Sequence, residues 1–310
     1  MSLVAVTGAS GFIGHHVVSA FHSAGLRVRA VVRQALDSDR FPPEVERACV
    51  PRIDGSTDWS GILDGVDAVV HLAGVAHRIG VAERAAREEY QAVNVAGTSR
   101  LAEAVAKAGI RRLVFVSSIA VFGSSADRPV SEATPVAPDS AYGRSKLEAE
   151  RGLQRALADG PGDWVIVRPP LVYGPGNPGN MARLLRLIRS GLPLPLGAVR
   201  NRRSFLYVEN LADLLRTVVR ATAASRRCFV VADREVVSTT ELLQLIGQVI
   251  GKQVRLFPVP MPLLRALAAG SYSVKRLIGS FVVDGSLAEE TLGWVPTFSL
   301  AEGLRRTFGV

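Results

Sequence analysis

The sequence predicts an α/β protein built on a doubly wound parallel sheet, with a smaller, mostly helical C-terminal domain. Apolar runs with the length of buried strands alternate with helical stretches over the first 169 residues, which is the order of βαβ units in a parallel sheet. A glycine-rich turn, Thr7-Gly8-Ala9-Ser10-Gly11-Phe12-Ile13-Gly14, follows the first apolar run and opens the first helix. That order of strand, turn and helix is typical of a Rossmann-like fold.

The elements of the first part follow from strand–helix alternation and from glycines that end helices. Gly25 and Gly109 each follow a helical stretch and end it, because glycine readily adopts the left-handed conformation found after a helix. The apolar runs between the helices predict short buried strands that pair in parallel. We expect strands at 3–7, 26–32, 48–53, 67–72, 112–117 and 164–168, and helices at 12–24, 82–108 and 140–159.

The regular alternation ends at Pro169. The stretch 172–179 is rich in Gly and Pro, which predicts a loop. Ser238 and Ser299 each precede a Glu by three residues, which predicts two helices that begin with a capping box. We also expect a helix at 180–190, a strand at 204–208, a helix at 209–223 and a strand at 228–231 that returns to the sheet. The predicted domains are 1–169, with returning segments near 204–232, and a second, substrate-binding domain made of 170–203 and 233–310.

Composition favours a folded, cytoplasmic protein. The chain has 310 residues, 48% of them hydrophobic, which is ample for a buried core. A strand begins by Leu3, so we expect no signal peptide, and no uncharged apolar run is long enough to span a bilayer. The two cysteines, Cys49 and Cys228, fit a reducing compartment better than a disulfide scaffold.

The net charge of +9 raises the question of a nucleic-acid partner. The arginines are spread over many segments, often as single helical positions, and no basic run alternates with aromatic residues. An arginine-rich solvated surface accounts for this pattern, so we expect neither nucleic acid nor a membrane as a partner. A basic balance also suits an anionic substrate.

The glycine-rich turn predicts a bound dinucleotide, NAD or NADP. Gly8, Gly11 and Gly14 let the backbone turn tightly and approach a pyrophosphate, while the following helix offers free N–H groups and the positive end of its dipole. An acid after the second strand would bind the ribose hydroxyl of NAD. Arg33 stands there instead and could pair with the 2′-phosphate of NADP, although an arginine that stacks on adenine or is simply solvated remains open.

A tyrosine and a lysine on one helix predict proton transfer. Tyr142 and Lys146 are four residues apart, so their side chains share a helix face. A nearby ammonium stabilises a phenolate and lowers its pKa, which suits tyrosine for proton transfer near neutral pH. Ser117 and Ser118 end a buried strand, and the carboxyl ends of parallel strands form the ligand crevice of such sheets. Together these side chains indicate hydride transfer to or from a carbinol carbon, with Tyr142 moving the proton.

Short motifs run along nearly the whole chain. They are TGASGFIG at 7–14, HLAG at 71–74, NVAGT at 94–98, FVSSIAVFG at 115–123, YGRSK at 142–146, VRPPLVYGPG at 167–176 and RRSFLYVENLAD at 202–213. As a set they resemble the extended short-chain dehydrogenase/reductase family, in its NAD-dependent epimerase/dehydratase branch. The set is highly specific for the family and much less so for one activity.

The resemblance implies roles for particular residues. It implies that Ser118 is the catalytic serine, Tyr142 the acid/base and Lys146 its partner. The residues that it implies for the cofactor, with Arg33, are Gly8, Ser10, Gly11, Phe12, Ile13, Gly14, Asp54 at the adenine amino group, Leu72, Ala73, Gly74, Asn94, Tyr142 and Lys146. Those implied for the substrate are Asn180 and Arg203 at a diphosphate, Leu196 near a nucleobase, and His77, Ser118 and Tyr142 at the sugar.

Four positions depart from the family pattern. Phe122 stands where a tyrosine is usual, Leu171 replaces an asparagine, Ser204 replaces the acid of an Arg-Asp pair, and Ala76 stands where some 4-epimerases have a lysine. These departures bear on the identity of the sugar and leave the catalytic groups in place. The run at 201–204 resembles enzymes of surface-polysaccharide and O-antigen sugar pathways.

The resemblance implies an NAD(P)-dependent nucleotide-sugar 4-epimerase that acts on a UDP-hexose or UDP-N-acetylhexosamine through a 4-keto intermediate. The alternative is a 4-ketoreductase that consumes NADPH, which Arg33 favours. A 4,6-dehydratase fits less well, because Ile119 and Ala120 stand where those enzymes have an acid pair. A non-catalytic NADP-binding sensor is a further class, and the intact catalytic residues argue against it. We expect no metal site.

The resemblance also implies a homodimer, formed through the helix that carries Tyr142 and the long helix at 82–108. Leu147, Leu153 and Leu157 give the first of these helices an apolar face. That face could meet a partner subunit, or it could pack inside the monomer.

Overall fold

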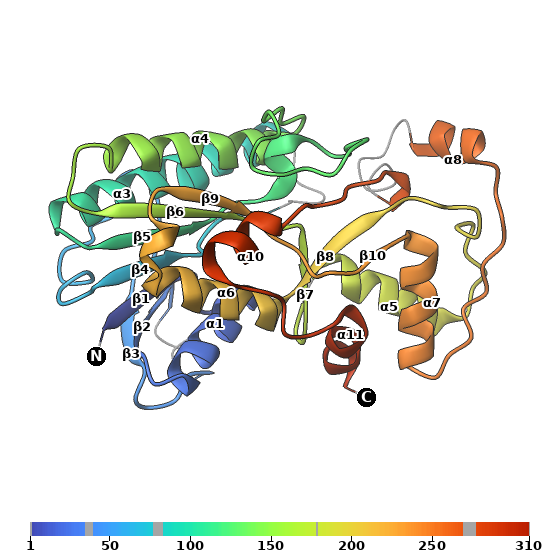
Figure 1. The fold of residues 1–310 in the computed structure, drawn as a ribbon, viewed down its shortest axis with the longest axis horizontal. Helices are drawn as coiled ribbons and strands as arrows, with labels where there is room; N and C mark the ends of the chain where they lie inside the picture. Colours follow the sequence, from blue (N-terminus) through green and yellow to red (C-terminus); the bar gives the residue numbers. More distant parts are fainter. Residues whose placement is uncertain (1, 35–39, 77–82, 178, 269–276, 310) are drawn as a thin grey trace.

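The computed structural model describes residues 2–34, 40–76, 83–177, 179–268 and 277–309. These residues form two sheets, and Figure 1 shows the smaller one between the large sheet and the helices α5 and α7. A seven-stranded parallel sheet has the order β3-β2-β1-β4-β5-β6-β9, and a three-stranded sheet has the order β10-β8-β7. The large sheet is wound in both directions from β1, as in the Rossmann fold, so the predicted fold class is confirmed.

The bounds of the elements follow the sequence pattern closely. The large sheet contains β1 (Leu3–Thr7), β2 (Arg27–Val32), β3 (Glu46–Cys49), β4 (Ala68–His71), β5 (Arg112–Val116), β6 (Asp163–Arg168) and β9 (Arg227–Val230). The small sheet contains β7 (Leu171–Tyr173), β8 (Arg203–Tyr207) and β10 (Val236–Val237). The helices are α1 (Phe12–Ser23), α2 (Glu83–Glu89), α3 (Thr98–Lys107), α4 (Ala141–Ala156), α5 (Asn180–Ser190), α6 (Val208–Arg220), α7 (Thr239–Val249), α8 (Met261–Ala268), α10 (Ser286–Leu292) and α11 (Leu300–Phe308).

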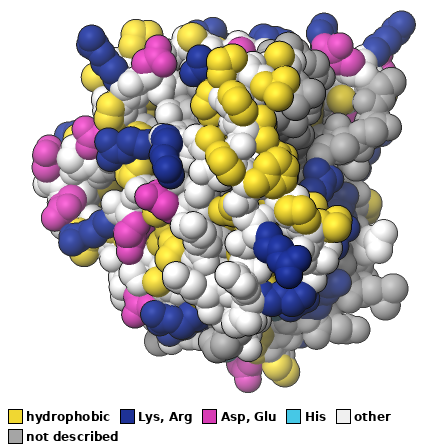
Figure 2. Space-filling model, turned by 90° about the vertical axis from the view of Figure 1, so that its right-hand side faces the viewer, with side chains coloured by type: hydrophobic (Ala, Val, Ile, Leu, Met, Phe, Trp, Pro, Cys, Tyr) yellow, Lys and Arg dark blue, Asp and Glu magenta, His cyan; other side chains and the backbone are white. Residues whose placement is uncertain are grey.

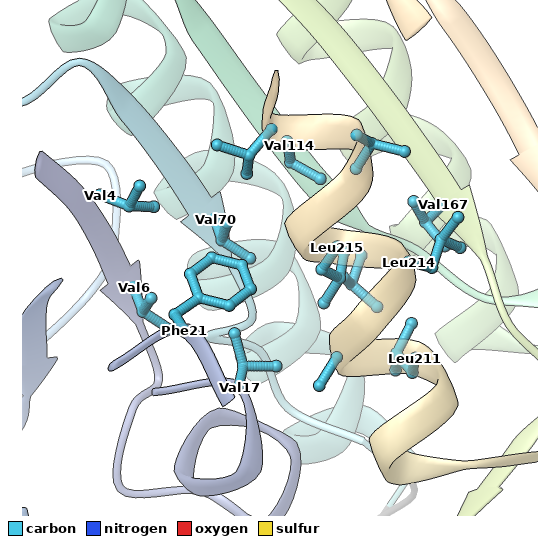
Figure 3. Packing of buried hydrophobic residues seen from close by; sticks show 14 of the residues in the cluster. Val4, Val6, Val17, Phe21, Val70, Val114, Val167, Leu211, Leu214 and Leu215 are labelled. Carbon is cyan, nitrogen blue, oxygen red and sulfur yellow. The ribbon is translucent and has the colours of Figure 1, made fainter. Parts of the chain in front are cut away.

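Helices cover both faces of the large sheet. Successive side chains of a strand point to opposite faces, so Val4 and Val6 of β1 pack with α1 and α6, while Leu3 and Ala5 pack with α3 and α4. Figure 3 shows the first of these interfaces, in which the labelled residues are Val4, Val6, Val17, Phe21, Val70, Val114, Val167, Leu211, Leu214 and Leu215. Burial of each such side chain stabilises the fold by about 1.5–3 kcal/mol.

Two elements of the large-sheet part differ from the expectation. The strand expected at 48–53 is β3, which ends at Cys49, because Pro51 has no N–H group to donate to the ladder. The helix expected at 82–108 is not uniform, because a π-helical turn over Tyr90–Gly97 joins α2 to α3. In a π-helix each backbone hydrogen bond spans five residues instead of the four of an α-helix, and such segments are frequent at functional sites.

The segments near 204–232, which were predicted to return to the first domain, divide between the two sheets. Helix α6 and strand β9 join the large sheet as expected, but β8 pairs with β7 and β10 in the small one. Val172 and Tyr173 are also strand residues of β7 rather than part of a loop. Tyr173 is fully buried and donates a hydrogen bond to Asp233 at 3.1 Å, so a distant partner overrides the local Gly and Pro signal.

The small sheet packs with α5, α7 and α11 around a second core. Both predicted capping boxes form: Ser238 caps α7 with Glu241, and Ser299 caps α11 with Glu302. In the described part of the chain, no helix is long and apolar enough to cross a membrane.

The leucines expected on a dimer face of α4 lie inside the monomer. Leu153 and Leu157 are fully buried against the large sheet, and Leu147 packs against the cluster around Val121 and Phe122. Leu153 and Leu157 are therefore not available to a partner subunit, whereas Leu147 is partly buried.

Candidate active site

A cavity of about 730 Å³ lies where the large sheet meets the C-terminal part. Its walls come from the residues that follow β1, β4, β5 and β6, which are the carboxyl ends of neighbouring parallel strands, and from α4, α5 and β8. A ligand crevice at this edge is what the fold predicts. The charged residues among the described lining are Lys146, Arg183 and Arg203, with no acid, so the cavity suits an anionic ligand.

The glycine-rich turn closes one end of this cavity. Gly8 has a φ of +69°, and a Cβ there would lie 2.7 Å from the Ala73 nitrogen. A Cβ on Gly14 would lie 2.1 Å from the Gly8 carbonyl oxygen, so α1 can approach β1 only without a side chain. Gly11 starts α1 and makes no side-chain cap, which leaves the first N–H groups of the helix for a ligand. The turn therefore fits the pyrophosphate of a dinucleotide.

Ser118, Tyr142 and Lys146 all line the same cavity, as the sequence predicted. Ser118 starts a 3₁₀ turn over Ile119–Phe122 and accepts a hydrogen bond from Ala120 N at 3.1 Å. Helix α4 approaches that turn so closely that a Cβ on Gly143 would lie 2.3 Å from the Ala120 carbonyl oxygen. This contact holds the first turn of α4, which carries Tyr142, beside Ser118.

Lys146 is buried beneath the cavity floor. Its ammonium donates a hydrogen bond to the Val116 carbonyl oxygen at 2.8 Å and lies 4.1 Å from the centre of the Phe115 ring. Burial lowers the pKa of Lys146 to about 7, although the Glu150 carboxylate acts in the opposite direction. A lysine with such a pKa changes its charge readily, which suits a group that works beside a proton-transferring tyrosine.

His71 lies next to Lys146 and remains neutral. One ring nitrogen is 2.6 Å from the Thr7 hydroxyl and the other is 3.0 Å from the Thr98 hydroxyl, and the ring stacks on Phe115. Burial, followed by repulsion from Lys146, lowers the pKa of His71 to about 3. A neutral ring there adds no second positive charge below the cavity.

Asn94 links two segments that border the cavity. It lies on the π-helical turn, is buried, and accepts a hydrogen bond from Val75 N at 2.8 Å. Its amide nitrogen donates to the Val75 carbonyl oxygen and to the Ser145 hydroxyl, each at 3.0 Å. Asn94 therefore joins the segment after β4 to α4. Its side chain does not line the cavity.

The C-terminal part supplies further residues of the cavity lining. Arg203 is buried and donates a hydrogen bond to the Gly279 carbonyl oxygen at 3.0 Å. Arg183, one turn into α5, also lines the cavity, as does Phe281, which pairs with the Arg203 backbone. Arg203 was predicted from the sequence, whereas Arg183 and Phe281 were not. Arg183 could have been found from its position three residues after Asn180 on the same helix.

Ser117 is among the residues that line the cavity. Its hydroxyl is buried and has no hydrogen-bond partner among the described residues. A buried polar group without a partner costs free energy, so this position beside Ser118 is less stable than a fully hydrogen-bonded one.

The other residues implied for cofactor and substrate fall in three groups. Those that line the cavity are Gly8, Gly11, Phe12, Ile13, Gly14, Leu72 and Gly74. Those that lie outside its lining are Ser10, Arg33, Asp54, Ala73 and Leu196. His77 and the side chain of Asn180 lie outside what the structure describes. Hydrogen bonds from Ser56 and the neighbouring Arg52 lower the pKa of Asp54, so its carboxylate is charged near the end of β3.

No group of His, Cys, Asp and Glu side chains that could hold a metal ion occurs within the described residues. The reactive side chains that line the cavity include the hydroxyl of Ser118, the phenol of Tyr142 and the ammonium of Lys146.

Comparison with known proteins agrees with this geometry. The model of the NAD dependent epimerase/dehydratase family matches residues 4–232, which include the glycine-rich turn, the three catalytic candidates and Arg203. The chain belongs to that family. The family and the relatives that follow make the chain an NAD-dependent sugar-nucleotide enzyme.

Relatives of this epimerase/dehydratase cover nearly its whole length. A UDP-glucose 4-epimerase of Vibrio cholerae is 36% identical over 98% of this chain and 94% of its own. An N-acetyl-alpha-D-glucosaminyl-diphospho-ditrans,octacis-undecaprenol 4-epimerase of Escherichia coli O157:H7 is 28% identical over 98% of this chain and 93% of its own. The structure of MoeE5 in complex with UDP-glucuronic acid and NAD has a TM-score of 0.80 and 28% identity, over 99% of this chain and 97% of that chain.

Proposed function

We propose that this protein is an NAD-dependent 4-epimerase of a nucleoside-diphosphate sugar, with a UDP-hexose or UDP-N-acetylhexosamine as substrate. The observation that supports this most strongly is that Ser118, Tyr142 and Lys146 share one cavity with the glycine-rich turn and with two arginines, Arg183 and Arg203. The names of the relatives from V. cholerae and E. coli both describe 4-epimerases, which agrees with that arrangement.

The glycine-rich turn and the residues after β4 would hold the cofactor. Gly8, Gly11 and Gly14 leave room for the pyrophosphate, and Leu72 and Gly74 line the path towards the catalytic groups. A bound nicotinamide supplies a carbon that accepts a hydride from the sugar C4 and returns it. The NAD in the MoeE5 complex supports NAD rather than NADP.

The catalytic side chains would manage the proton on the sugar. Tyr142 takes the proton of the C4 hydroxyl as that carbon is oxidised, and it gives the proton back when the carbonyl is reduced. Ser118 donates a hydrogen bond to the same oxygen and holds it in place. Lys146 favours the phenolate of Tyr142 by its positive charge, and its buried position, 2.8 Å from the Val116 oxygen, fixes that charge below the cavity.

The arginines would anchor the diphosphate while the sugar turns. Arg183 and Arg203 line the part of the cavity away from the glycine-rich turn. Guanidinium groups bind phosphate oxygens through several charge-assisted hydrogen bonds. With the diphosphate held there, the 4-keto sugar can rotate and present its other face, which inverts C4 on reduction.

The carrier of the sugar is a separate question from the chemistry at C4. The E. coli relative is named for a substrate whose diphosphate joins the sugar to a polyprenol instead of a nucleoside. A sugar linked to a diphosphate is the chemistry common to both substrates. We propose UDP as the carrier because the V. cholerae relative, which is more similar in sequence, is named for UDP-glucose.

A 4-ketoreductase that consumes NADPH is the second candidate, and Arg33 is the observation that favours it. Arg33 is exposed directly after β2, where a 2′-phosphate of NADP could meet it. A homodimer is also proposed, through the surface of α4 and the helices that flank the π-helical turn, which pack side by side.

Incubation of the purified protein with UDP-galactose tests these proposals. The epimerase is expected to form UDP-glucose with no added cofactor, and denaturation of the protein is expected to release NAD in about stoichiometric amount. Loss of NADPH absorbance in proportion to a 4-keto sugar, with no interconversion of UDP-sugars, would establish the ketoreductase instead. The same pair of assays with the N-acetylhexosamine substrates identifies the sugar.

A further inference from the structure

The positive charge of this protein is concentrated in two segments that contain no acid. Residues 169–208 hold six Lys and Arg residues and residues 242–283 hold five, without one Asp or Glu in either. The rest of the chain has the remaining 26 of the 37 basic residues against all 28 acidic ones. The net charge of +9 therefore comes from the C-terminal part alone, and not from a uniformly basic surface.

Within the described residues, α5 and α8 lie at the same end of the molecule, together with the chain that joins α7 to α8 (Figure 1). Leu194 N donates a hydrogen bond to the Arg255 carbonyl oxygen at 2.8 Å, and Phe257 N donates to the Leu194 carbonyl oxygen at 3.1 Å. Lys252 reaches the carbonyl oxygen at the end of α5, on Arg189, at 2.5 Å. The exposed side chains of 183–202 and 252–265 thus share one surface, which we call the α5–α8 face.

Large apolar side chains gather on this face. Of the five large hydrophobic side chains exposed among the described residues, four belong to it: Leu187, Leu192, Phe257 and Leu263. Leu192 is 64% exposed and Leu263 is 54% exposed, so neither has a partner that covers it in the monomer. Figure 2, which views this end, shows hydrophobic side chains gathered in the upper centre with Lys and Arg side chains around them.

The arginines of the face are free to meet an external anion. The exposed ones are Arg183, Arg186, Arg189, Arg200, Arg202, Arg255 and Arg265. Among the described residues these seven form no ion pair, whereas Arg27, Arg84 and Arg216 elsewhere each do. Apolar side chains surrounded by unpaired arginines are the composition of surfaces that lie in the headgroup region of an anionic bilayer.

The face adjoins the mouth of the cavity. Arg183 lines the cavity, and Leu187 follows it by four residues on α5, so the two side chains lie on the same side of the helix. One helical turn of about 5.4 Å therefore separates a residue of the substrate site from the apolar patch.

We propose that the α5–α8 face binds peripherally to an anionic membrane surface. Its arginines would contact lipid phosphates, and Leu192, Phe257 and Leu263 would insert at the boundary between headgroups and acyl chains. This replaces the expectation, made from the sequence, that no membrane is a partner. A second copy of the chain fits less well, because seven like charges would face one another across a two-fold interface. Docking in this orientation places the cavity mouth, which Arg183 lines, at the headgroup layer, and it does not depend on the carrier of the sugar in the proposed function.

Sedimentation with vesicles tests the proposal on the full protein. Wild-type protein is expected to bind vesicles that contain phosphatidylglycerol and not vesicles of phosphatidylcholine alone, and binding is expected to weaken as salt rises. Each basic residue near an anionic surface contributes about fivefold to the partition coefficient. Arg186→Gln with Arg189→Gln is thus expected to weaken binding roughly 25-fold. The matched control, Arg220→Gln with Arg227→Gln, removes two exposed charges on the large-sheet part and is expected to leave binding unchanged.

A second pair of substitutions tests the apolar patch, which consists of Leu187, Leu192, Phe257 and Leu263. Leu192→Glu with Phe257→Glu is expected to abolish vesicle binding, while Val295→Glu, at an exposed valine outside the face, is expected to retain it. Turnover of the soluble nucleotide sugar, measured in the same preparations, reports folding and tests the proposed function separately. Equal binding by patch variants and controls overturns the proposal. So does loss of a dimer in Leu192→Glu with Phe257→Glu while vesicle binding persists, since the face would then join two copies.

Discussion

The ammonium of Lys146 lies 2.8 Å from the carbonyl oxygen of Val116, the last residue of β5, and donates a hydrogen bond to it. Ser117 and Ser118 follow directly after Val116. One hydrogen bond thus ties the helix that carries Tyr142 to the strand that carries the serine. The hydrogen bond to β5 fixes the position of the Lys146 ammonium. Because burial lowers the pKa of Lys146 to about 7, the charge of this group depends on pH near neutrality.

The first prediction concerns this charge and the stability of the protein stripped of nucleotide. The pKa of Lys146 falls from 10.5 in the unfolded chain to about 7 in the folded one, so between these values the unfolded state binds the extra proton. The free energy of unfolding of wild type relative to Lys146→Met should therefore rise with pH, by up to about 1.4 kcal/mol per pH unit between about 7 and 10.5. Denaturant titrations of both proteins at several pH values measure it. A difference that does not vary with pH would show that Lys146 keeps its ordinary pKa.

Tyr142→Phe should remove turnover and leave the dinucleotide bound. The phenol is the proposed proton carrier, and loss of general acid–base catalysis lowers rates by about 10²–10⁴-fold. The bound nucleotide extracted from the variant should match that of wild type, because the glycine-rich turn is untouched. Tyr90→Phe is the control, since that ring lies edge-on to Tyr142, with 6.0 Å between the ring centres, and does not line the cavity. Wild-type turnover by Tyr142→Phe contradicts the assigned role.

Gly14→Ala should destabilise the protein and weaken dinucleotide retention together. The added Cβ would lie 2.1 Å from the Gly8 carbonyl oxygen, so α1 must move away from the turn. Forced packing of this kind costs about 1–3 kcal/mol. Gly160→Ala adds the same methyl group in a loop where the nearest atom is 4.0 Å away, and it should change neither quantity. Thermal unfolding of the two variants measures the loss of stability, and nucleotide extraction measures the retained dinucleotide. Equal values for Gly14→Ala and Gly160→Ala would contradict the prediction.

Arg183→Gln should raise KM for the nucleotide sugar by roughly tenfold or more, because a charge-assisted hydrogen bond contributes about 1.5–3 kcal/mol. Arg186→Gln changes the same helix and the same charge outside the cavity lining, and its KM should be that of wild type. Steady-state kinetics on the soluble substrate separate the two variants. Equal KM values would remove Arg183 from the substrate site.

Most of the large sheet was predictable because its strands are short apolar runs with their own boundary signals, whereas β3, which contains Glu46 and Arg47, was predicted two residues too late. β1 and β5 were placed within a residue, and the glycine after α1 marked the end of that helix. The small sheet was not predictable in this way. β7 lies within a Gly- and Pro-rich stretch, and only its pairing with β8 and the hydrogen bond from Tyr173 to Asp233 make it a strand.

The same contrast applies to the site. Tyr142 and Lys146 were found because their spacing on one helix is local. Ser117 and Ser118 were found because they follow a buried strand, and the family resemblance chose Ser118 between them. His71 and Phe281 owe their places to contacts between segments far apart in the chain. No periodicity or motif in the sequence predicts that a neutral histidine would lie beside Lys146, or that the backbone of Phe281 would pair with that of Arg203.

Transfer of a deuterium label tests the central claim most directly, namely that the cavity around Ser118, Tyr142 and Lys146 removes a hydride from C4 of the sugar and returns it to the same carbon. UDP-galactose labelled with deuterium at C4 is converted in ordinary water, and the product is analysed by mass spectrometry. The proposed mechanism predicts UDP-glucose that retains the label at C4, since the hydride never exchanges with solvent. Product that has lost the deuterium to water would contradict it.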